Sequence, residues 1–224
     1  MMTYKEFEIF LKESFPDTTS RMLEQFRLMD GGYREWNAKI NVISRKDIDG
    51  LYDHHILHSM AIAEYLRAQN PEAYSSFINP AEGMKILDLG TGGGFPGIPL
   101  AVMFPKVKFI LCDSVGKKTI VAREMAQMLG LENVEIVNAR AESLPGEFDY
   151  VVSRAVASLT DFYPWVKGKF TGSILYLKGG DINEEICNLM SREHLRRGSI
   201  TTWPVSSWLK DSYFDGKFVV DIRR

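Results

Sequence analysis

The fold of this chain is decided by the stretch Lys85-Ile86-Leu87-Asp88-Leu89-Gly90-Thr91-Gly92-Gly93-Gly94-Phe95-Pro96-Gly97. A short apolar run ends at an acid, glycines crowd the turn that follows, and the apolar segment 98–102 begins beyond it. That order predicts a strand, a glycine loop and a helix, which together bring backbone N–H groups and a helix N-terminus beside a ligand. Because glycine alone lets the backbone approach a ligand closely, we expect a nucleotide-like cofactor here.

The glycine loop fits two patterns. Residues 92–97 satisfy G-x-G-x-x-G, and Asp113 follows at about the distance at which dinucleotide-binding folds place a ribose-binding acid. One register earlier, residues 88–94 form D-x-G-x-G-x-G, which resembles motif I of class I methyltransferases that use S-adenosylmethionine (SAM). A tight strand-to-helix turn without any ligand is the third interpretation.

The sequence downstream of the loop predicts further strands and a fold class. Apolar runs at 107–113, 133–137, 148–155 and 173–178 read as strands, with a helix over 117–129 and another over 182–195. Asp215-Gly216 lies between apolar stretches and predicts a hairpin over 213–220, whose last strand runs in reverse. We therefore expect an α/β fold with a seven-stranded, doubly wound, mostly parallel sheet.

The first eighty residues predict helices that cap this sheet. An apolar stripe at three- and four-residue spacing runs from Met22 to Ile40, and Gly31-Gly32 predicts a bend or a break in it. A second helix is expected over about 51–68, followed by a linker over 70–84. We therefore divide the chain into an N-terminal helical extension, residues 1–80, and a SAM-binding methyltransferase domain, residues 81–224.

Four segments of the chain occur in the order found in one family of enzymes. They are GTGGGFPGIPLA at 90–101, DSVGKK at 113–118, SRAVASL at 153–159 and LKG at 177–179. With WNAKINVIS at 36–44 and HILHS at 55–59, they resemble the bacterial ribosomal RNA small-subunit methyltransferase G family, formerly called glucose-inhibited division protein B. The resemblance covers residues from about 26 to 180, and His58 departs from it because the family commonly has Asp there.

This resemblance implies transfer of a methyl group from SAM to N7 of a guanine in 16S rRNA. The chain lacks an N/D-P-P-Y/F motif and has no cysteine in a Pro-Cys or Thr-Cys context. Guanine N7 has a lone pair and no proton to lose, so proximity and orientation can suffice, and no general base is assigned. The alternatives are a SAM-dependent methyltransferase acting on a small molecule or a protein, and a non-catalytic nucleotide-binding or NAD-binding module.

Position in the motifs and the resemblance together suggest site residues. The expected cofactor-binding residues are Asp88 orienting the loop, Gly90, Gly92 and Gly94 lining it, Phe95 beside it, Asp113 at the ribose hydroxyls, Ala141 and Glu142 at the adenine, and Arg154 at the end of the fourth strand. The expected RNA contacts are Lys117, Lys178 and Arg154. Asp113 could instead cap the following helix, and Arg154 could instead be a salt-bridged structural arginine.

The histidines of the second helix give a weaker signal. His54 and His58 are four residues apart and could share a metal, but no further ligands accompany them, so no metal site is expected. We expect surface or interface histidines, with His55 the one that the resemblance marks. Cys112 and Cys187 are far apart in sequence and suggest no disulfide framework.

Composition is that of an ordinary globular enzyme, with 224 residues, 45% hydrophobic and 25% charged. No apolar run approaches the ~20 residues of a membrane span, and the first residues are polar, so we expect a cytoplasmic protein that is a monomer. The net charge of −2 lacks the positive footprint of a protein that grips free RNA. We therefore expect the substrate to be rRNA within a small-subunit particle that supplies part of the docking surface.

Overall fold

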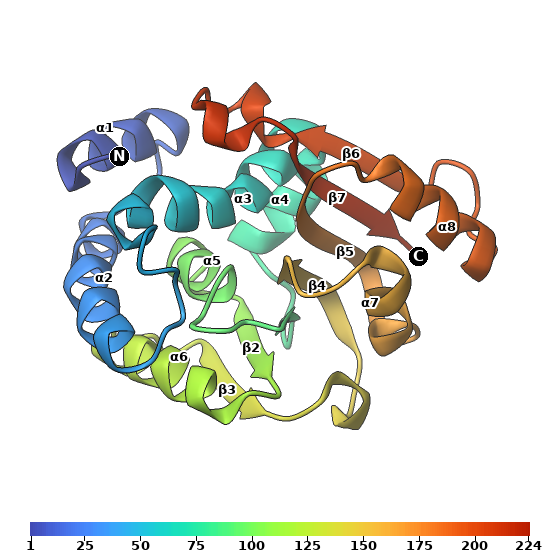
Figure 1. Ribbon diagram of the computed structural model, residues 1–224, viewed down its shortest axis with the longest axis horizontal. Helices are drawn as coiled ribbons and strands as arrows, with labels where there is room; N and C mark the ends of the chain where they lie inside the picture. Colours follow the sequence, from blue (N-terminus) through green and yellow to red (C-terminus); the bar gives the residue numbers. More distant parts are fainter.

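A computed structural model describes residues 1–224 and contains one seven-stranded sheet with the order β3-β2-β1-β4-β5-β7-β6 (Figure 1). The strands are β1 Lys85–Leu89, β2 Lys108–Asp113, β3 Val134–Asn138, β4 Phe148–Arg154, β5 Phe170–Gly179, β6 Ile200–Pro204 and β7 Lys217–Arg223. Strands β1 to β5 are parallel, whereas β7 is antiparallel to both β5 and β6. The prediction of a doubly wound, mostly parallel α/β sheet is confirmed.

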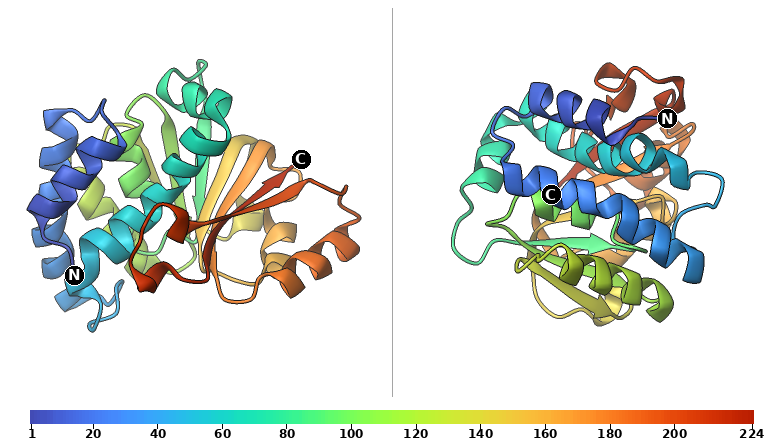
Figure 2. Two further views of the ribbon diagram at one scale, coloured as in Figure 1. Left: turned by 90° about the horizontal axis from the view of Figure 1, so that it is seen from above. Right: turned by 90° about the vertical axis from the view of Figure 1, so that its left-hand side faces the viewer.

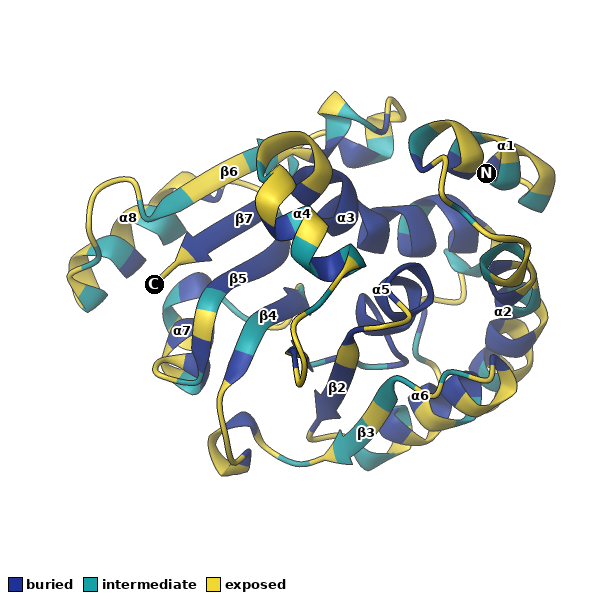
Figure 3. Ribbon diagram, turned by 180° about the vertical axis from the view of Figure 1, so that it is seen from behind, coloured by how far each residue is buried: buried dark blue, intermediate teal, exposed yellow.

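Helices cover both faces of the sheet (Figure 2). They are α1 Tyr4–Ser14, α2 Ser20–Lys39, α3 His58–Gln69, α4 Pro71–Ile78, α5 Gly97–Met103, α6 Gly116–Met128, α7 Leu159–Val166 and α8 Asn183–Glu193. The first six pack with one face of the sheet in a hydrophobic cluster of 41 buried residues, and α7 and α8 pack on the other in a cluster of 19. Figure 3 shows strands such as β2, β5 and β7 largely buried between these two layers, whereas the edge strands β3 and β6 are intermediate or exposed.

The N-terminal helices share the larger of these cores with the sheet. Phe7 of α1 and Phe26 of α2 are fully buried in it together with Phe109 of β2. The division of the chain at residue 80 into an extension and a catalytic domain stays a prediction. None of the helices combines the length and the apolar character that crossing a membrane requires.

The expected break at Gly31-Gly32 is wrong, because α2 runs without interruption from Ser20 to Lys39. Gly32 faces α6, where a Cβ would lie 2.5 Å from Met128 Cε and 2.8 Å from Met125 Sδ. The glycine therefore allows two helices to approach closely, and burial of the surrounding apolar stripe outweighs its low helix propensity.

The expected linker over 70–84 is also wrong in its first half, which forms α4. The Asn70 side chain accepts a hydrogen bond from the Ala73 N–H at 3.2 Å, and Pro71 takes the first helical position, where its missing N–H costs nothing. Asn-Pro therefore starts a helix here as well as ending α3. The segment preceding α3, Leu51–Leu57, is a π-helix, which the pattern of apolar residues did not predict.

The expected hairpin over 213–220 is wrong as well. Strand β6 lies at Ile200–Pro204, and a connection containing two short 3-10 turns leads from it to β7. Phe214 is buried in one of those turns, so its apolar character reflects core packing and not a strand. Asp215-Gly216 only leads the chain into β7. The reversed last strand is nevertheless confirmed, and it lies between β5 and β6.

The unexpected helix α4 is part of the core. Phe77 is fully buried, with its ring centroid 5.1 Å from that of Phe104 and 4.9 Å from that of Tyr150. We expect Phe77→Ala to lower the free energy of unfolding by about 3–5 kcal/mol, because it opens a cavity among these rings. Denaturant unfolding measures this change. Ser75→Ala, on the exposed face of the same helix, is the control and should stay within about 0.5 kcal/mol of the parent.

Candidate active site

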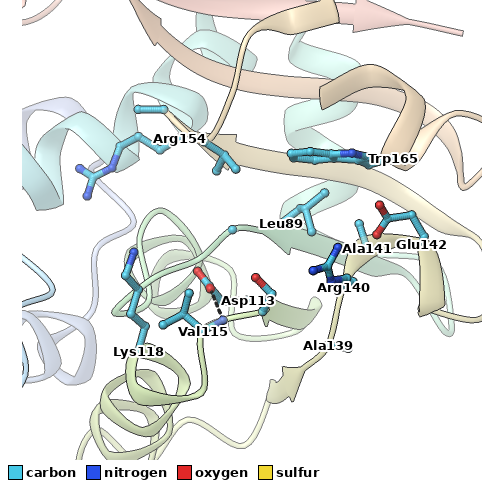
Figure 4. A pocket seen from close by; sticks show the side chains of 14 residues that line it. Leu89, Asp113, Val115, Lys118, Ala139, Arg140, Ala141, Glu142, Arg154 and Trp165 are labelled. Carbon is cyan, nitrogen blue, oxygen red and sulfur yellow. Dashed lines mark hydrogen bonds between the residues drawn. The ribbon is translucent and has the colours of Figure 1, made fainter. Parts of the chain in front are cut away.

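A cavity of about 520 Å³ opens at the carboxyl ends of β1 to β4 (Figure 4). Its wall consists of Leu89 and Gly90 after β1, Asp113 to Val115 after β2, Ala139 to Glu142 after β3, and Arg154 to Val156 after β4, with Lys118 of α6 and Trp165 of α7. Figure 4 shows Lys118 and Arg154 at one end of the cavity and Trp165 and Glu142 at the other. This edge is where open α/β sheets bind their ligands.

A buried carboxylate fixes the glycine loop below the cavity. Asp88 Oδ2 accepts hydrogen bonds from the Thr91 hydroxyl at 2.6 Å and from the Gly97 N–H at 2.7 Å. A Cβ at Gly97 would lie 2.5 Å from that same oxygen, so only glycine allows this approach. The carboxylate therefore ties both ends of the loop to strand β1.

Asp88 is fully buried, and its second oxygen, Oδ1, has no hydrogen-bond partner. Burial raises the pKa of Asp88 to about 7, although the hydrogen bonds from Thr91 and Gly97 oppose this shift. A carboxyl group with a pKa near neutral pH thus lies on β1, between the two loop residues that it bonds.

Asp113 is a buried carboxylate on the cavity wall itself. Its Oδ2 accepts a hydrogen bond from the Gly92 N–H at 2.9 Å and its Oδ1 accepts one from the Val115 N–H at 2.8 Å. Helix α6 begins at Gly116 without a side-chain cap. Asp113 therefore connects the glycine loop to the turn after β2.

The structure brings together five of the predicted site residues in the cavity wall: Gly90, Asp113, Ala141, Glu142 and Arg154. The other cofactor residues, Asp88, Gly92, Gly94 and Phe95, belong to the loop beneath and do not line the cavity. Phe95 is buried under the ring of Tyr33, with centroids 4.7 Å apart.

The two predicted lysines lie elsewhere. Lys117 is exposed and outside the wall, which is lined by Lys118 instead. Lys178 is largely buried. Its Nζ lies 2.9 Å from Glu185 Oε2 and donates to the Ala157 carbonyl at 3.0 Å. Glu185 also accepts a hydrogen bond from the Leu159 N–H at 2.8 Å, so this pair holds the segment after β4.

Arg154 is not the salt-bridged structural arginine that was the alternative, because no carboxylate lies within 4.0 Å of it. Its Cζ lies over the Phe95 ring, 5.0 Å from the centroid, and its Nη2 donates to His55 Nδ1 at 3.3 Å. Burial lowers the pKa of the guanidinium from its ordinary value, which still leaves it charged at neutral pH.

Sequence reasoning missed nine of the 14 residues of the wall, among them the large side chains of Lys118, Arg140 and Trp165. The sequence could have indicated Lys118. It precedes the buried Val121 and Ala122 by three and four residues and so shares the helix face that packs on the sheet. Arg140 follows β3 directly in the loop that was assigned to the adenine. Trp165 lies on α7, a helix that was not predicted.

The expectation that these histidines lie at the surface is wrong for His55 and His58, whereas an interface role stays a prediction. His55 and His58 are buried, and both His54 and His55 contact the carboxylate of Asp47. His54 Nδ1 lies 2.6 Å from Asp47 Oδ1, whereas neither ring nitrogen of His58 has a hydrogen-bond partner. The π-helical backbone of Leu51–Leu57 changes which side chains share a face, and i, i+4 spacing fails there.

A parallel sheet with one reversed strand near its edge, a glycine loop tied to an acid of β1, and a cavity over the strand ends define a class I methyltransferase. Magnesium protoporphyrin IX methyltransferase from Synechocystis PCC 6803, solved with bound SAM, has the same fold: the TM-score is 0.61, at 13% identity over 92% of this chain and 98% of that one.

Sequence comparison places the chain more narrowly. The model of the rRNA small subunit methyltransferase G family matches residues 23–205. Ribosomal RNA small subunit methyltransferase G of Flavobacterium psychrophilum is 43% identical over 93% of this chain and 94% of its own length. The protein of the same name from Christiangramia forsetii is 44% identical over 94% of each. The chain belongs to the rRNA small subunit methyltransferase G family and is a SAM-dependent methyltransferase.

The first prediction from the site concerns Gly92, which has a φ of +57° and donates its N–H to Asp113. We expect Gly92→Asp to abolish SAM binding while the protein stays folded, because it strains the loop and brings a second negative charge to Asp113. Isothermal titration calorimetry with SAM measures the loss. Gly83→Asp is the control, since Gly83 also has a positive φ, +80°, but lies in open space away from the cavity. Affinity retained in Gly92→Asp would contradict the site.

The second prediction concerns Asp88, whose pKa is raised to about 7 in the folded protein from an ordinary value of 3.8. Between these values the folded state holds a proton that the unfolded state has lost, so this group makes stability fall as pH rises from about 4 to 7. Asp88→Asn cannot ionise and should lack this part of the fall. Urea unfolding at pH 4.5 and 7.5 compares the two proteins, with the exposed Asp17→Asn expected to follow the wild type. Identical pH profiles of wild type and Asp88→Asn would contradict the prediction.

Proposed function

We propose that this enzyme transfers the methyl group of SAM to N7 of a guanine in 16S rRNA. One observation of the site carries the choice of an RNA substrate. Lys118, Arg140 and Arg154 lie in the cavity wall, and none of them forms an ion pair. Some lysines and arginines on other faces, such as Lys12 and Arg67, are paired with acids and others are unpaired, but only Lys118, Arg140 and Arg154 line the cavity. Unpaired cations at a cavity attract a polyanion, even in a protein whose net charge is −2.

The wall also has the groups that SAM requires. Asp113 would accept hydrogen bonds from the ribose hydroxyls, exchanging its bond with Gly92 for one with the ligand. Ala141 and Glu142 would flank the adenine, opposite the half-buried Trp165. Gly90 would face the methionine part from the wall, and Gly92, Gly94, Asp88 and Phe95 would support it from below. When bound, SAM supplies an electrophilic methyl group on its sulfonium.

The polar groups of the wall support N7, the atom that the family resemblance implies, as the reacting atom. The wall has no histidine, tyrosine or cysteine, and its two carboxylates, Asp113 and Glu142, lie at the parts assigned to ribose and adenine. Guanine N7 attacks through its lone pair and has no proton to transfer. Holding it in line with the methyl group then lowers the barrier by proximity and orientation.

The lysines take different parts in this proposal. Lys118 and the exposed Lys117 would contact phosphates of the RNA near the cavity mouth. Lys178 would act from behind, since its bonds to Glu185 and Ala157 hold the segment on which Val156 faces the cavity. Arg154 would contact the cofactor or the guanine.

The charge balance favours an assembled particle over naked RNA as the substrate. Three unpaired cations line the cavity and the chain as a whole is slightly acidic, so ribosomal proteins or folded rRNA would have to add contacts. Such a substrate would place the enzyme in the cytoplasm. A single copy of the chain contains every residue that we assign to the site.

A transfer experiment tests the proposal. The purified enzyme is incubated with methyl-labelled SAM and small ribosomal subunits, naked 16S rRNA or no acceptor, and labelled bases are mapped. We expect label in the rRNA as 7-methylguanine, with more turnover on subunits than on naked rRNA. Label on another base, or none in RNA while SAM still binds, would contradict the proposal and favour a small-molecule or protein acceptor.

A further inference from the structure

The guanidinium of Arg154 depends on His55 for its orientation. Its Cζ lies over the Phe95 ring, 5.0 Å from the centroid, a contact that does not fix the direction of the N–H groups, and no carboxylate lies within 4.0 Å. The remaining directional contact is the hydrogen bond from Nη2 to His55 Nδ1 at 3.3 Å. The two residues are 99 positions apart in the chain, so this contact joins the segment before α3 to the end of β4.

His55 is fixed in turn by Asp47. Arginine only donates hydrogen bonds, so His55 Nδ1 must accept, and the proton of the neutral ring then lies on Nε2. That nitrogen lies 2.8 Å from Asp47 Oδ2, to which it donates. Burial, together with the charge of Arg154, lowers the pKa of His55 to about 4, which keeps the ring neutral at physiological pH.

Asp47 has a second contact that leads away from the cavity. Its Oδ1 lies 2.6 Å from His54 Nδ1, and the His54 ring stacks on Tyr213 with centroids 3.5 Å apart. Two consecutive histidines thus share one carboxylate, but His55 alone connects it to Arg154. This difference provides a matched control within the chain.

We propose that Asp47 is a positioning residue for methyl transfer, because its carboxylate fixes the tautomer of His55 and thereby the direction of the Arg154 guanidinium at the cavity. Asp47 does not line the cavity and touches no substrate in this scheme. The arrangement resembles the way a carboxylate orients a histidine whose other nitrogen does the contacting. The inference rests on the proposed function only for its assay on rRNA.

A double-mutant cycle tests the connection. We expect Asp47→Ala to lower kcat/KM for methyl transfer by about 10- to 100-fold, the cost of misplacing a group in a catalytic site. His54→Phe keeps the stacking on Tyr213 and should stay within about twofold of the wild type. In an Arg154→Ala background, Asp47→Ala should cost nothing further. An Asp47→Ala effect no larger than that of His54→Phe, or an undiminished effect without Arg154, would overturn the proposal.

Two further measurements separate positioning from support of the fold. His55→Gln keeps an acceptor towards Arg154 and a donor towards Asp47, so it should retain at least tenfold more activity than His55→Leu at equal thermal stability. Equal activity of these two variants would count against the scheme. They also keep the proposal open to test if Asp47→Ala does not fold.

Imidazole ¹⁵N NMR tests the scheme without RNA. It should show His55 as the neutral Nε2–H tautomer between pH 5 and 8, and Asp47→Ala should lose this preference. A protonated ring or the Nδ1–H tautomer in the wild type would overturn the proposal. If SAM binds and the tautomer is as expected but rRNA is not methylated, the proposed function fails while the positioning scheme stands.

Discussion

The site depends on one buried carboxylate, Asp88, and on the absence of a side chain at Gly97. The carboxylate accepts hydrogen bonds from Thr91 and Gly97 on either side of the glycine loop, with no solvent to replace them. The positions of Gly92 and Phe95 depend on this connection. The Gly92 N–H is held where it meets Asp113, and Phe95 is held where its ring carries the guanidinium of Arg154. Burial raises the pKa of Asp88 to about 7, and this weaker ionisation is the cost of keeping the loop in place.

The distribution of charge explains how a slightly acidic protein can act on a polyanion. Of the two acids of the wall, Asp113 is engaged by backbone N–H groups, whereas Glu142 is exposed and unpaired; Asp47, outside the wall, is engaged by two histidines. The cations of the wall have no such partners. Net charge describes solubility and long-range attraction, whereas local unpaired charge describes what a cavity can hold.

The sequence predicts the parallel part of the sheet well, because strands buried on both faces are continuous apolar runs with acids or glycines at their ends. It predicts the edge formed by β6 badly. Strand β6 is only half-buried, and its residues Ile200–Pro204 do not form such a run. Asn70-Pro71 is equally compatible with a helix end and a helix start, and only the packing of Phe77 decides between them. In the site, residues that follow strand ends could be predicted, whereas the contacts of Arg154 with Phe95 and His55 depend on segments that meet only in the folded chain.

The order of the strands at that edge also affects how the molecule forms during synthesis. Strand β6 pairs only with β7, and β7 follows it in the chain to lie between β6 and β5. Until residues 217–223 have left the ribosome, β6 has no hydrogen-bonding partner and β5 presents an open, apolar edge. A nascent chain stopped before that point exposes the kind of edge on which other chains aggregate. Completion of the sheet is therefore a late, all-or-none event, and premature termination a few codons upstream of β7 would remove two strands instead of one.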